Sequence, residues 1–272
     1  MKLLTRLLPW LPRWGRAVAP GLIAVALLAA CQSLSLQPQL PEALSASPAL
    51  AVSGRHGWLP DRQALRFGAH STGPRRLRQQ WEQRQCPAGC SRFDLGVFAA
   101  EFDSRFSRAR SRLQFTQEGE GAAPLAVEAV LVEEREEREW SWRVFGKTLH
   151  GGQGRELVHP YTGTLLPLSG DAPAWRFIVG EQQGMDTAVW LGWAESEAGQ
   201  RIELRSLLSW TVRPGGGGLA LPAGYLLESE GRAVAAVQLL GGGEVWFAPD
   251  LEPSLRQASA ALISSLLLRP RR

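Results

Sequence analysis

The stretch Arg-Ile-Glu-Leu-Arg-Ser-Leu-Leu-Ser-Trp-Thr-Val, residues 201–212, alternates between two kinds of side chain. In an extended strand, successive side chains point to opposite faces. One face of this stretch therefore carries Ile202, Leu204, Ser206, Leu208, Trp210 and Val212. A mostly apolar face opposite a polar one is typical of an antiparallel sheet with one buried side. Residues 138–146 repeat the pattern, with Trp140, Trp142 and Val144 on one face.

Short apolar runs broken by glycine, proline or charge predict further strands. They cover residues 92–99, 112–117, 125–133, 139–145, 175–179, 188–194, 225–228, 233–239 and 244–248. Glu230-Gly231 predicts a hairpin turn. Near the C-terminus, Asp250 as N-cap and Pro253 in the first turn predict a helix over 251–268. We expect a mainly β fold, an antiparallel sandwich or half-open barrel, with this C-terminal helix packed on it.

The first 30 residues have the three parts of a secretory signal. Lys2, Arg6, Arg13 and Arg16 form a basic start, and residues 17–30 carry no charge. This apolar run is shorter than the roughly 20 residues that a transmembrane helix needs. We therefore predict a signal peptide at residues 1–30.

Leu28-Ala29-Ala30-Cys31 resembles the lipobox of bacterial lipoproteins, and the resemblance covers only about the first 33 residues. It implies that the Cys31 thiol receives a diacylglycerol and that, after cleavage, the new amine is acylated, palmitate being the expected acyl group. Gln32 in place of Asp implies an outer-membrane location on the periplasmic side. Two or three acyl chains hold a protein at a membrane, since each buried methylene contributes about 0.8 kcal/mol.

Downstream of Cys31, the composition predicts two regions. Residues 31–50 are rich in Ser, Pro, Gln and Ala, which predicts a lipidated flexible tether. Residues 51–272 then form the β-rich periplasmic domain. In an oxidising compartment, the remaining pair, Cys86 and Cys90, is expected to form a local disulfide.

Charge argues against a nucleic-acid partner. The chain carries 30 basic and 26 acidic side chains, but the four basic residues of the signal peptide leave 26 against 26 in the mature protein. Nucleic-acid binding relies on a positive surface. The charges are nevertheless uneven: residues 55–112 hold twelve arginines against five acids, and residues 113–140 hold eight glutamates against two arginines. These blocks either pair across the fold or form a basic surface toward anionic lipid or an acidic partner.

Tryptophan is abundant, with nine of the eleven in the mature chain. Strand periodicity favours core packing, and ligand stacking on a sheet is the alternative. The candidate ligand or partner surface consists of Trp140, Trp142, Trp190, Trp193 and Trp210.

Catalytic motifs are incomplete. His-Gly-Gly-Gln-Gly at 150–154 is similar to an oxyanion-hole loop, but the sequence has no Gly-x-Ser-x-Gly elbow, and we interpret it as a glycine-rich hairpin. Histidine spacing fits no zinc motif. We therefore predict no catalytic, cofactor or metal residues and a non-enzymatic role in binding a protein partner or envelope component. The alternatives are a lipid or glycan carrier with a Trp-lined cavity and a serine hydrolase using Ser71 or His150.

Overall fold

The structure is a computed structural model that describes residues 36–55, 63–87, 90–95, 98–119, 121–170, 172–183, 188–211 and 220–270. The chain divides into two units, one of Met1–Gln37 with Trp210–Leu219 and one of Pro38–Ser209 with Ala220–Arg272. The second unit holds nearly all of the described residues.

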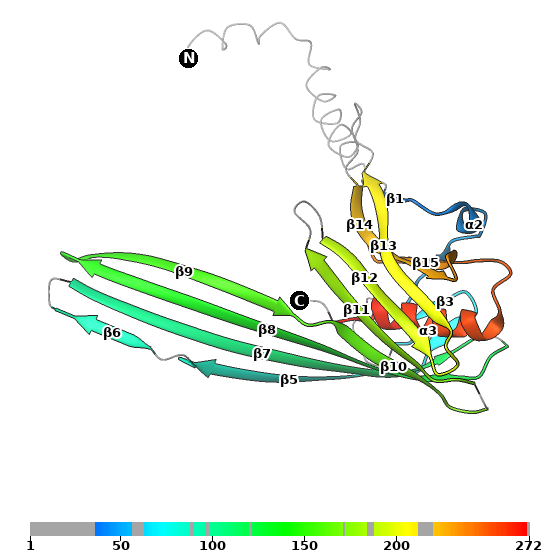
Figure 1. The fold of residues 1–272 in the computed structure, drawn as a ribbon, viewed down its shortest axis with the longest axis horizontal. Helices are drawn as coiled ribbons and strands as arrows, with labels where there is room; N and C mark the ends of the chain where they lie inside the picture. Colours follow the sequence, from blue (N-terminus) through cyan, green and yellow to red (C-terminus); the bar gives the residue numbers. More distant parts are fainter. Residues whose placement is uncertain are drawn as a thin grey trace, which may run out of the picture. The chain divides into compact units, whose positions relative to one another are not determined.

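Antiparallel strands dominate the described chain (Figure 1). The elements are β1 (Leu36–Pro38), α2 (Glu42–Ser45), β2 (Leu50–Ala51), β3 (Arg66–Phe67), β4 (His70–Thr72), β5 (Arg76–Gln85), β6 (Ser91–Asp94), β7 (Phe98–Glu118), β8 (Leu125–Val144), β9 (Lys147–Val158), β10 (Tyr161–Pro167), β11 (Trp175–Gln183), β12 (Ala188–Ser196), β13 (Arg201–Thr211), β14 (Ala220–Ser229), β15 (Arg232–Gln238), β16 (Glu244–Phe247) and α3 (Pro253–Leu267).

The strands form one nearly closed, barrel-like sheet in the order β2-β16-β15-β14-β13-β12-β11-β10-β8-β7-β4-β3. Its two edges meet where Ser53, just after β2, bridges Arg66 of β3 through two backbone hydrogen bonds of 2.9 and 3.0 Å. The predicted mainly β fold with a C-terminal helix is confirmed. The Glu230-Gly231 turn is also confirmed, with positive φ at both residues, between β14 and β15.

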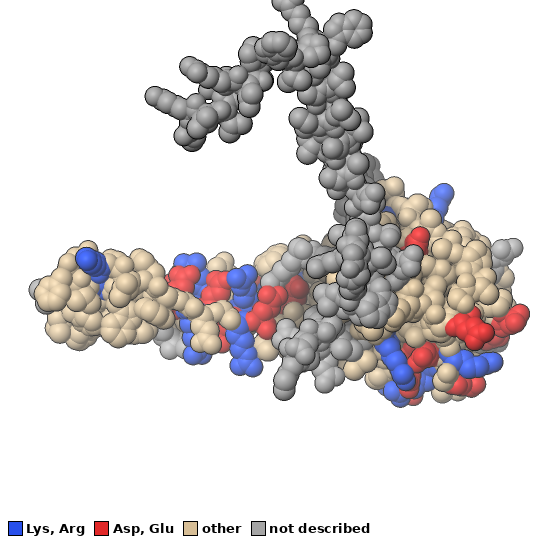
Figure 2. Space-filling view, turned by 90° about the horizontal axis from the view of Figure 1, so that it is seen from above, with Lys and Arg blue, Asp and Glu red and all other residues tan. Residues whose placement is uncertain are grey.

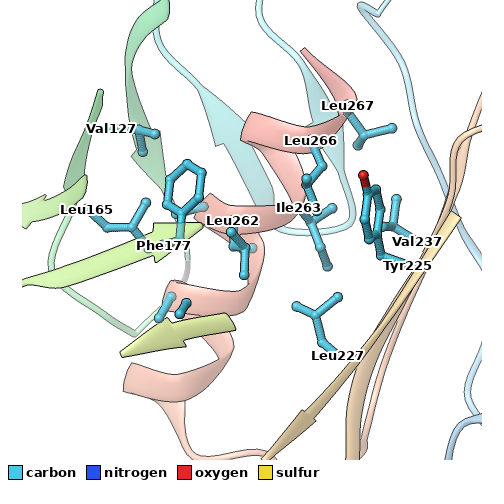
Figure 3. Packing of buried hydrophobic residues seen from close by; sticks show 14 of the residues in the cluster. Val127, Leu165, Phe177, Tyr225, Leu227, Val237, Leu262, Ile263, Leu266 and Leu267 are labelled. Atoms are coloured by element: carbon cyan, nitrogen blue, oxygen red, sulfur yellow. The ribbon is translucent and has the colours of Figure 1, made fainter. Parts of the chain in front are cut away.

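Helix α3 fills the inside of the curved sheet. Every residue from Gln257 to Leu267 is buried, so the helix is enclosed on all sides. Figure 3 shows its apolar side chains meeting those of strands on both sides of the sheet: Leu262, Ile263 and Leu266 of the helix lie among Val127, Leu165, Phe177, Tyr225, Leu227 and Val237. Burial of this kind is the main favourable term in folding.

The ends of α3 are held by charged side chains. The helix begins at Pro253, two residues later than predicted, and its N-cap is Glu252 instead of Asp250. The Glu252 carboxylate accepts a hydrogen bond from the Ser254 N–H. At the other end, the Arg55 guanidinium donates to the carbonyls of Leu267 (3.3 Å) and Leu239 (2.6 Å). A cation at a helix C-terminus complements the helix dipole.

The segment predicted as a tether differs from expectation from residue 38 onward. Leu44 in α2 is fully buried against Leu207, Ala236 and Trp246, on the opposite side of the sheet from α3. This outer layer buries Leu207. Leu208, which lies on the face predicted to be apolar, is exposed instead. The prediction of a flexible tether is therefore wrong for residues 38–50, whose apolar residues cover the sheet.

Strands β7 and β8 are far longer than predicted. The two expected strands at 125–133 and 139–145 are one strand of 20 residues, paired along its length with the 21 residues of β7. The intervening glutamates do not break the strand, because they alternate between its faces and pair with arginines. Arg108 of β7, for example, contacts Glu134 of β8 at 3.3 Å.

The distal part of these strands projects beyond the core as a ribbon (Figure 1). We define the ribbon as β5, β6, β9, residues 98–112 of β7 and residues 130–144 of β8. Leu131 is the last fully buried core residue on β8. The 13 residues beyond it extend about 40 Å at roughly 3.3 Å per residue.

Candidate functional site: the two faces of the ribbon

The ribbon has two chemically different faces, which the strand register defines. Cross-strand partners point to the same side of a sheet. At the tip, one face, here the aromatic face, carries the side chains of Phe93, Phe98, Phe102, Trp140, Trp142, Val144 and Leu149. Leu95 continues this row beyond β6, since its N–H donates to the Phe98 carbonyl at 2.8 Å. The other, here the acidic face, continues the core-facing side of the sheet and carries Glu101, Asp103, Glu139, Ser141 and His150.

The aromatic face is a contiguous cluster of rings around Trp142. Its ring centroid lies 5.6 Å from Phe98 and 6.3 Å from both Phe102 and Trp140, in edge-to-face arrangements. Such pairs stabilise each other beyond simple burial. The rings nevertheless face solvent: Trp140 is 41% exposed, Trp142 40% and Phe102 43%. A contiguous apolar patch exposed on a protein surface often marks an interaction site.

Gly151 explains how Trp140 is placed. It is the cross-strand partner of Trp140, and a Cβ built on it would overlap the indole ring. The ring therefore lies flat over the glycine backbone. The expected glycine-rich hairpin at 150–154 is wrong: these residues lie within β9, and the turn is at Phe145-Gly146 instead. The absence of a side chain at Gly151 leaves space for the Trp140 indole, and the glycines lie in a strand rather than in an oxyanion-hole loop.

The end of the ribbon is also apolar. Phe145 has φ of 47°, an uncommon conformation for a residue with a side chain, and it is 82% exposed at the β8–β9 turn. Leu95, beside the start of β7, is also exposed. Figure 2 shows this end as a largely uncharged surface, followed toward the body by alternating basic and acidic bands.

Charge divides between the two faces. The aromatic face carries nine cations against four acids, namely Arg76, Arg78, Arg84, Arg108, Arg110, Arg112, Arg138, Lys147 and Arg155 against Glu82, Glu134, Glu136 and, in the same cross-strand row as Arg76, Glu128, which contacts Arg112 at 3.0 Å. The acidic face carries four against seven, namely Arg92, Arg105, Arg135 and Arg143 against Asp94, Glu101, Asp103, Glu133, Glu137, Glu139 and Glu156. The uneven charge blocks of the sequence thus pair across the ribbon and also leave one face basic.

The acidic residues of the aromatic face form ion pairs with arginines. Glu82 contacts Arg84, Glu134 contacts Arg108 at 3.3 Å, and Glu136 contacts Arg138 at 2.9 Å. Among the residues that the structure describes, five cations of this face take part in no ion pair: Arg76, Arg78, Arg110, Lys147 and Arg155. The face therefore offers unneutralised positive charge next to its aromatic tip.

A disulfide lies at the edge of the ribbon. The sulfur atoms of Cys86 and Cys90 are at bonding distance, with the two Cα atoms 5.1 Å apart, as the sequence predicts. The pair joins the end of β5 to the start of β6, which both flank β7. The Asp103 carboxylate lies 3.1 Å from the Cys90 sulfur. The bridge thus holds β6, with Phe93, next to the strand that carries Phe98 and Phe102.

The structure describes the side chains of three of the five predicted tryptophans, and it places Trp193 on another strand pair than Trp140 and Trp142. Trp140 and Trp142 lie together on the aromatic face. Trp193 is half-buried on β12, where the guanidinium groups of Arg176 and Arg201 lie 5.7 and 5.4 Å from its ring centre. The side chains of Trp190 and Trp210 lie outside the described part of the structure. Sequence reasoning missed the phenylalanines of the cluster, although Phe98 and Phe102 share the alternation that marked the tryptophans.

The inside of the sheet offers little room for a ligand. The hollow between Trp175 and the start of α3 has a volume of about 230 Å³. Two further hollows with a tryptophan in their lining are surface hollows, one beside Trp140 on the ribbon of about 630 Å³ and one beside Trp175 and Arg176 of about 540 Å³. Ligand pockets usually measure about 300–1,000 Å³. Side chains of α3 occupy the space that a half-open barrel would otherwise offer to a lipid.

His70 is buried among aromatic side chains. His70 lies between the rings of Phe67 and Phe247, with centroids at 5.6 and 5.3 Å. Burial, together with nearby Arg256, lowers the pKa of His70. Ser71 follows it on β4 and so points to the opposite face.

His150 has a serine as its cross-strand neighbour. Ser141 lies between Glu101 on β7 and His150 on β9. A Ser-His-acid triad requires the histidine in the middle, between the acid and the nucleophile. His159 contacts Glu134 at 3.4 Å, and His56 lies outside the described residues. The order of groups across the ribbon thus differs from that of a hydrolase.

No known protein family, curated protein or solved structure matches this chain. Within the described residues, no helix combines the length and the apolar character that crossing a membrane requires.

Proposed function

We propose that the protein is a lipid-anchored binding protein of the bacterial envelope, and that the aromatic face of the ribbon tip is its binding surface. The observation that carries the proposal is the exposed ring cluster around Trp142, held on a ribbon that projects from an otherwise well-packed body. The lipobox at Cys31 supports an anchor at the outer membrane, facing the periplasm.

Energetics also favour a binding role for this cluster. Each indole of the pair exposes about 100 Å² if a tryptophan side chain presents roughly 250 Å². Covering that area yields about 2.5 kcal/mol per ring at 25 cal/mol per Å². Leaving several such rings in water is costly for solubility unless a partner covers them.

Site-specific photocrosslinking in growing cells tests the proposal. A photoreactive amino acid is placed at Leu149, on the aromatic face, or at the adjacent Thr148, which points to the opposite face of the same strand. We expect crosslinks to an envelope component from position 149, and their loss when Trp140 and Trp142 are both changed to serine. Equal crosslinking from positions 148 and 149, or none from either, would contradict the proposal.

A further inference from the structure

We infer that the component bound by the aromatic face is the surface of an anionic phospholipid bilayer, with the ribbon lying against it. This inference rests on the proposed function and names the occupant of the same surface. Three observations support lipid rather than a protein: the order of side chains along the ribbon, the unpaired cations on the same face, and the short stretch of chain between Cys31 and the packed unit.

Side chains along the aromatic face follow the order of preference for membrane depth. The end of the ribbon carries Phe145, Leu95 and Val144, and the next positions carry Trp142 and Trp140. The arginines and glutamates of this face begin only at Arg138; the one charged residue at the end is Lys147, the cross-strand partner of Val144. Aliphatic side chains and phenylalanine favour the hydrocarbon, whereas tryptophan concentrates at the headgroup level. Amphipathic segments on membranes bury their apolar face about 5–10 Å into this boundary.

The charges on the two faces of the ribbon are complementary to an anionic membrane that contacts the aromatic face. The five cations that form no ion pair among the described residues all lie on the same face as the rings. Lys147 lies at the end of the ribbon, and the four arginines lie between the rings and the body. Each basic residue near an anionic membrane contributes about fivefold in affinity. The acidic face, with seven carboxylates against four arginines, would be repelled and so points to water. Only one orientation of the ribbon satisfies both faces.

The position of Cys31 permits this contact. Six residues lie between Cys31 and Pro38, where the packed unit begins, so seven Cα–Cα steps join the two. Such a stretch spans at most about 25 Å at 3.6 Å per residue. An acylated Cys31 therefore keeps Pro38, where the packed unit begins, within about 25 Å of the membrane.

An environment-sensitive dye tests the inference on the acylated, full-length mature protein. Leu149→Cys or Thr148→Cys is labelled with nitrobenzoxadiazole, with the Cys86–Cys90 disulfide left oxidised. The protein is reconstituted into vesicles of phosphatidylethanolamine and phosphatidylglycerol, or into phosphatidylcholine vesicles. We expect the dye at 149 to shift to shorter wavelength and to be quenched by spin-labelled lipid in the anionic vesicles, while the dye at 148 stays as in water.

Two sets of variants refine the test. Trp140→Ser with Trp142→Ser should lower the fraction of dye at 149 in contact with lipid by at least tenfold, whereas Trp81→Ser should not change it. Trp81 is the matched control because it is an exposed tryptophan, 66% accessible, on the opposite face. Arg78→Gln with Arg110→Gln should lower contact about 25-fold in anionic vesicles, at fivefold for each arginine.

Two results would overturn the inference. A dye at 149 that stays as in water shows that lipid is not the occupant. If position 149 then crosslinks to a protein, the aromatic face is still a binding surface but its partner is that protein. If it crosslinks to nothing, both the proposed function and the lipid inference are contradicted. Equal quenching in phosphatidylcholine and anionic vesicles would contradict the role of anionic headgroups.

Discussion

Substitution of Leu262 by alanine should destabilise the protein severely, because its side chain lies at the centre of the helix that fills the sheet. Leu262 is fully buried among side chains of β8, β10 and β11. The change removes three carbon groups, which at about 0.8 kcal/mol each gives roughly 2.4 kcal/mol of lost transfer free energy. The cavity left in an enclosed site raises the loss to about 3–4 kcal/mol.

Urea denaturation of the mature protein in mild detergent, followed by tryptophan fluorescence and near-ultraviolet circular dichroism, measures the loss. Leu149→Ala is the matched control, since Leu149 is 66% exposed at the ribbon tip. There only about a third of the same area is buried, so less than 1 kcal/mol should be lost. If Leu262→Ala and Leu149→Ala had equal effects, α3 would not be the core of the fold.

Three further changes have defined outcomes. Cys31→Ser should leave the precursor uncut and unacylated, and normal palmitate labelling of this variant would rule out the anchor site. Gly151→Leu should displace the Trp140 indole, measured as a red shift of tryptophan emission with a loss of less than about 1 kcal/mol in stability; an unchanged spectrum would contradict the packing described. The pKa of His70 is lowered from 6.5 in the folded state, so the unfolded chain binds its proton more tightly and stability should fall as pH drops below about 6.5. His70→Gln should remove this part of the pH dependence between about pH 7 and pH 5, and identical pH profiles would refute the assignment.

Much of the architecture follows from local pattern. Alternation at 201–212 and 138–146 predicts strands, and the Pro253 signal predicts the final helix, because both depend on residues next to one another in the chain. The continuity of β8 through its glutamates could not be predicted, since it depends on arginines of β7 more than 20 residues away. The packing of Leu44 on the outside of the sheet also depends on residues far away in the chain. A Ser- and Pro-rich composition does not indicate where a single leucine packs.

The candidate site was only partly predictable. The common face of Trp140 and Trp142 follows from their spacing, but core packing and surface exposure give the same alternation. What separates them is the length of the ribbon beyond the core, a tertiary property. The basic character of the aromatic face likewise appears only when the register of five strands is known, because the arginines and glutamates come from separate blocks of sequence.

Spin labels placed singly at positions 147, 148, 149 and 150 of β9 test the central claim most directly. In anionic vesicles, power-saturation measurements of the acylated protein should show accessibility to oxygen that alternates with a period of two residues, high at 147 and 149 and low at 148 and 150. Accessibility to a water-soluble nickel complex should alternate in the opposite sense. Values at all four positions that match those of the protein in detergent-free solution without vesicles would contradict membrane contact through the aromatic face.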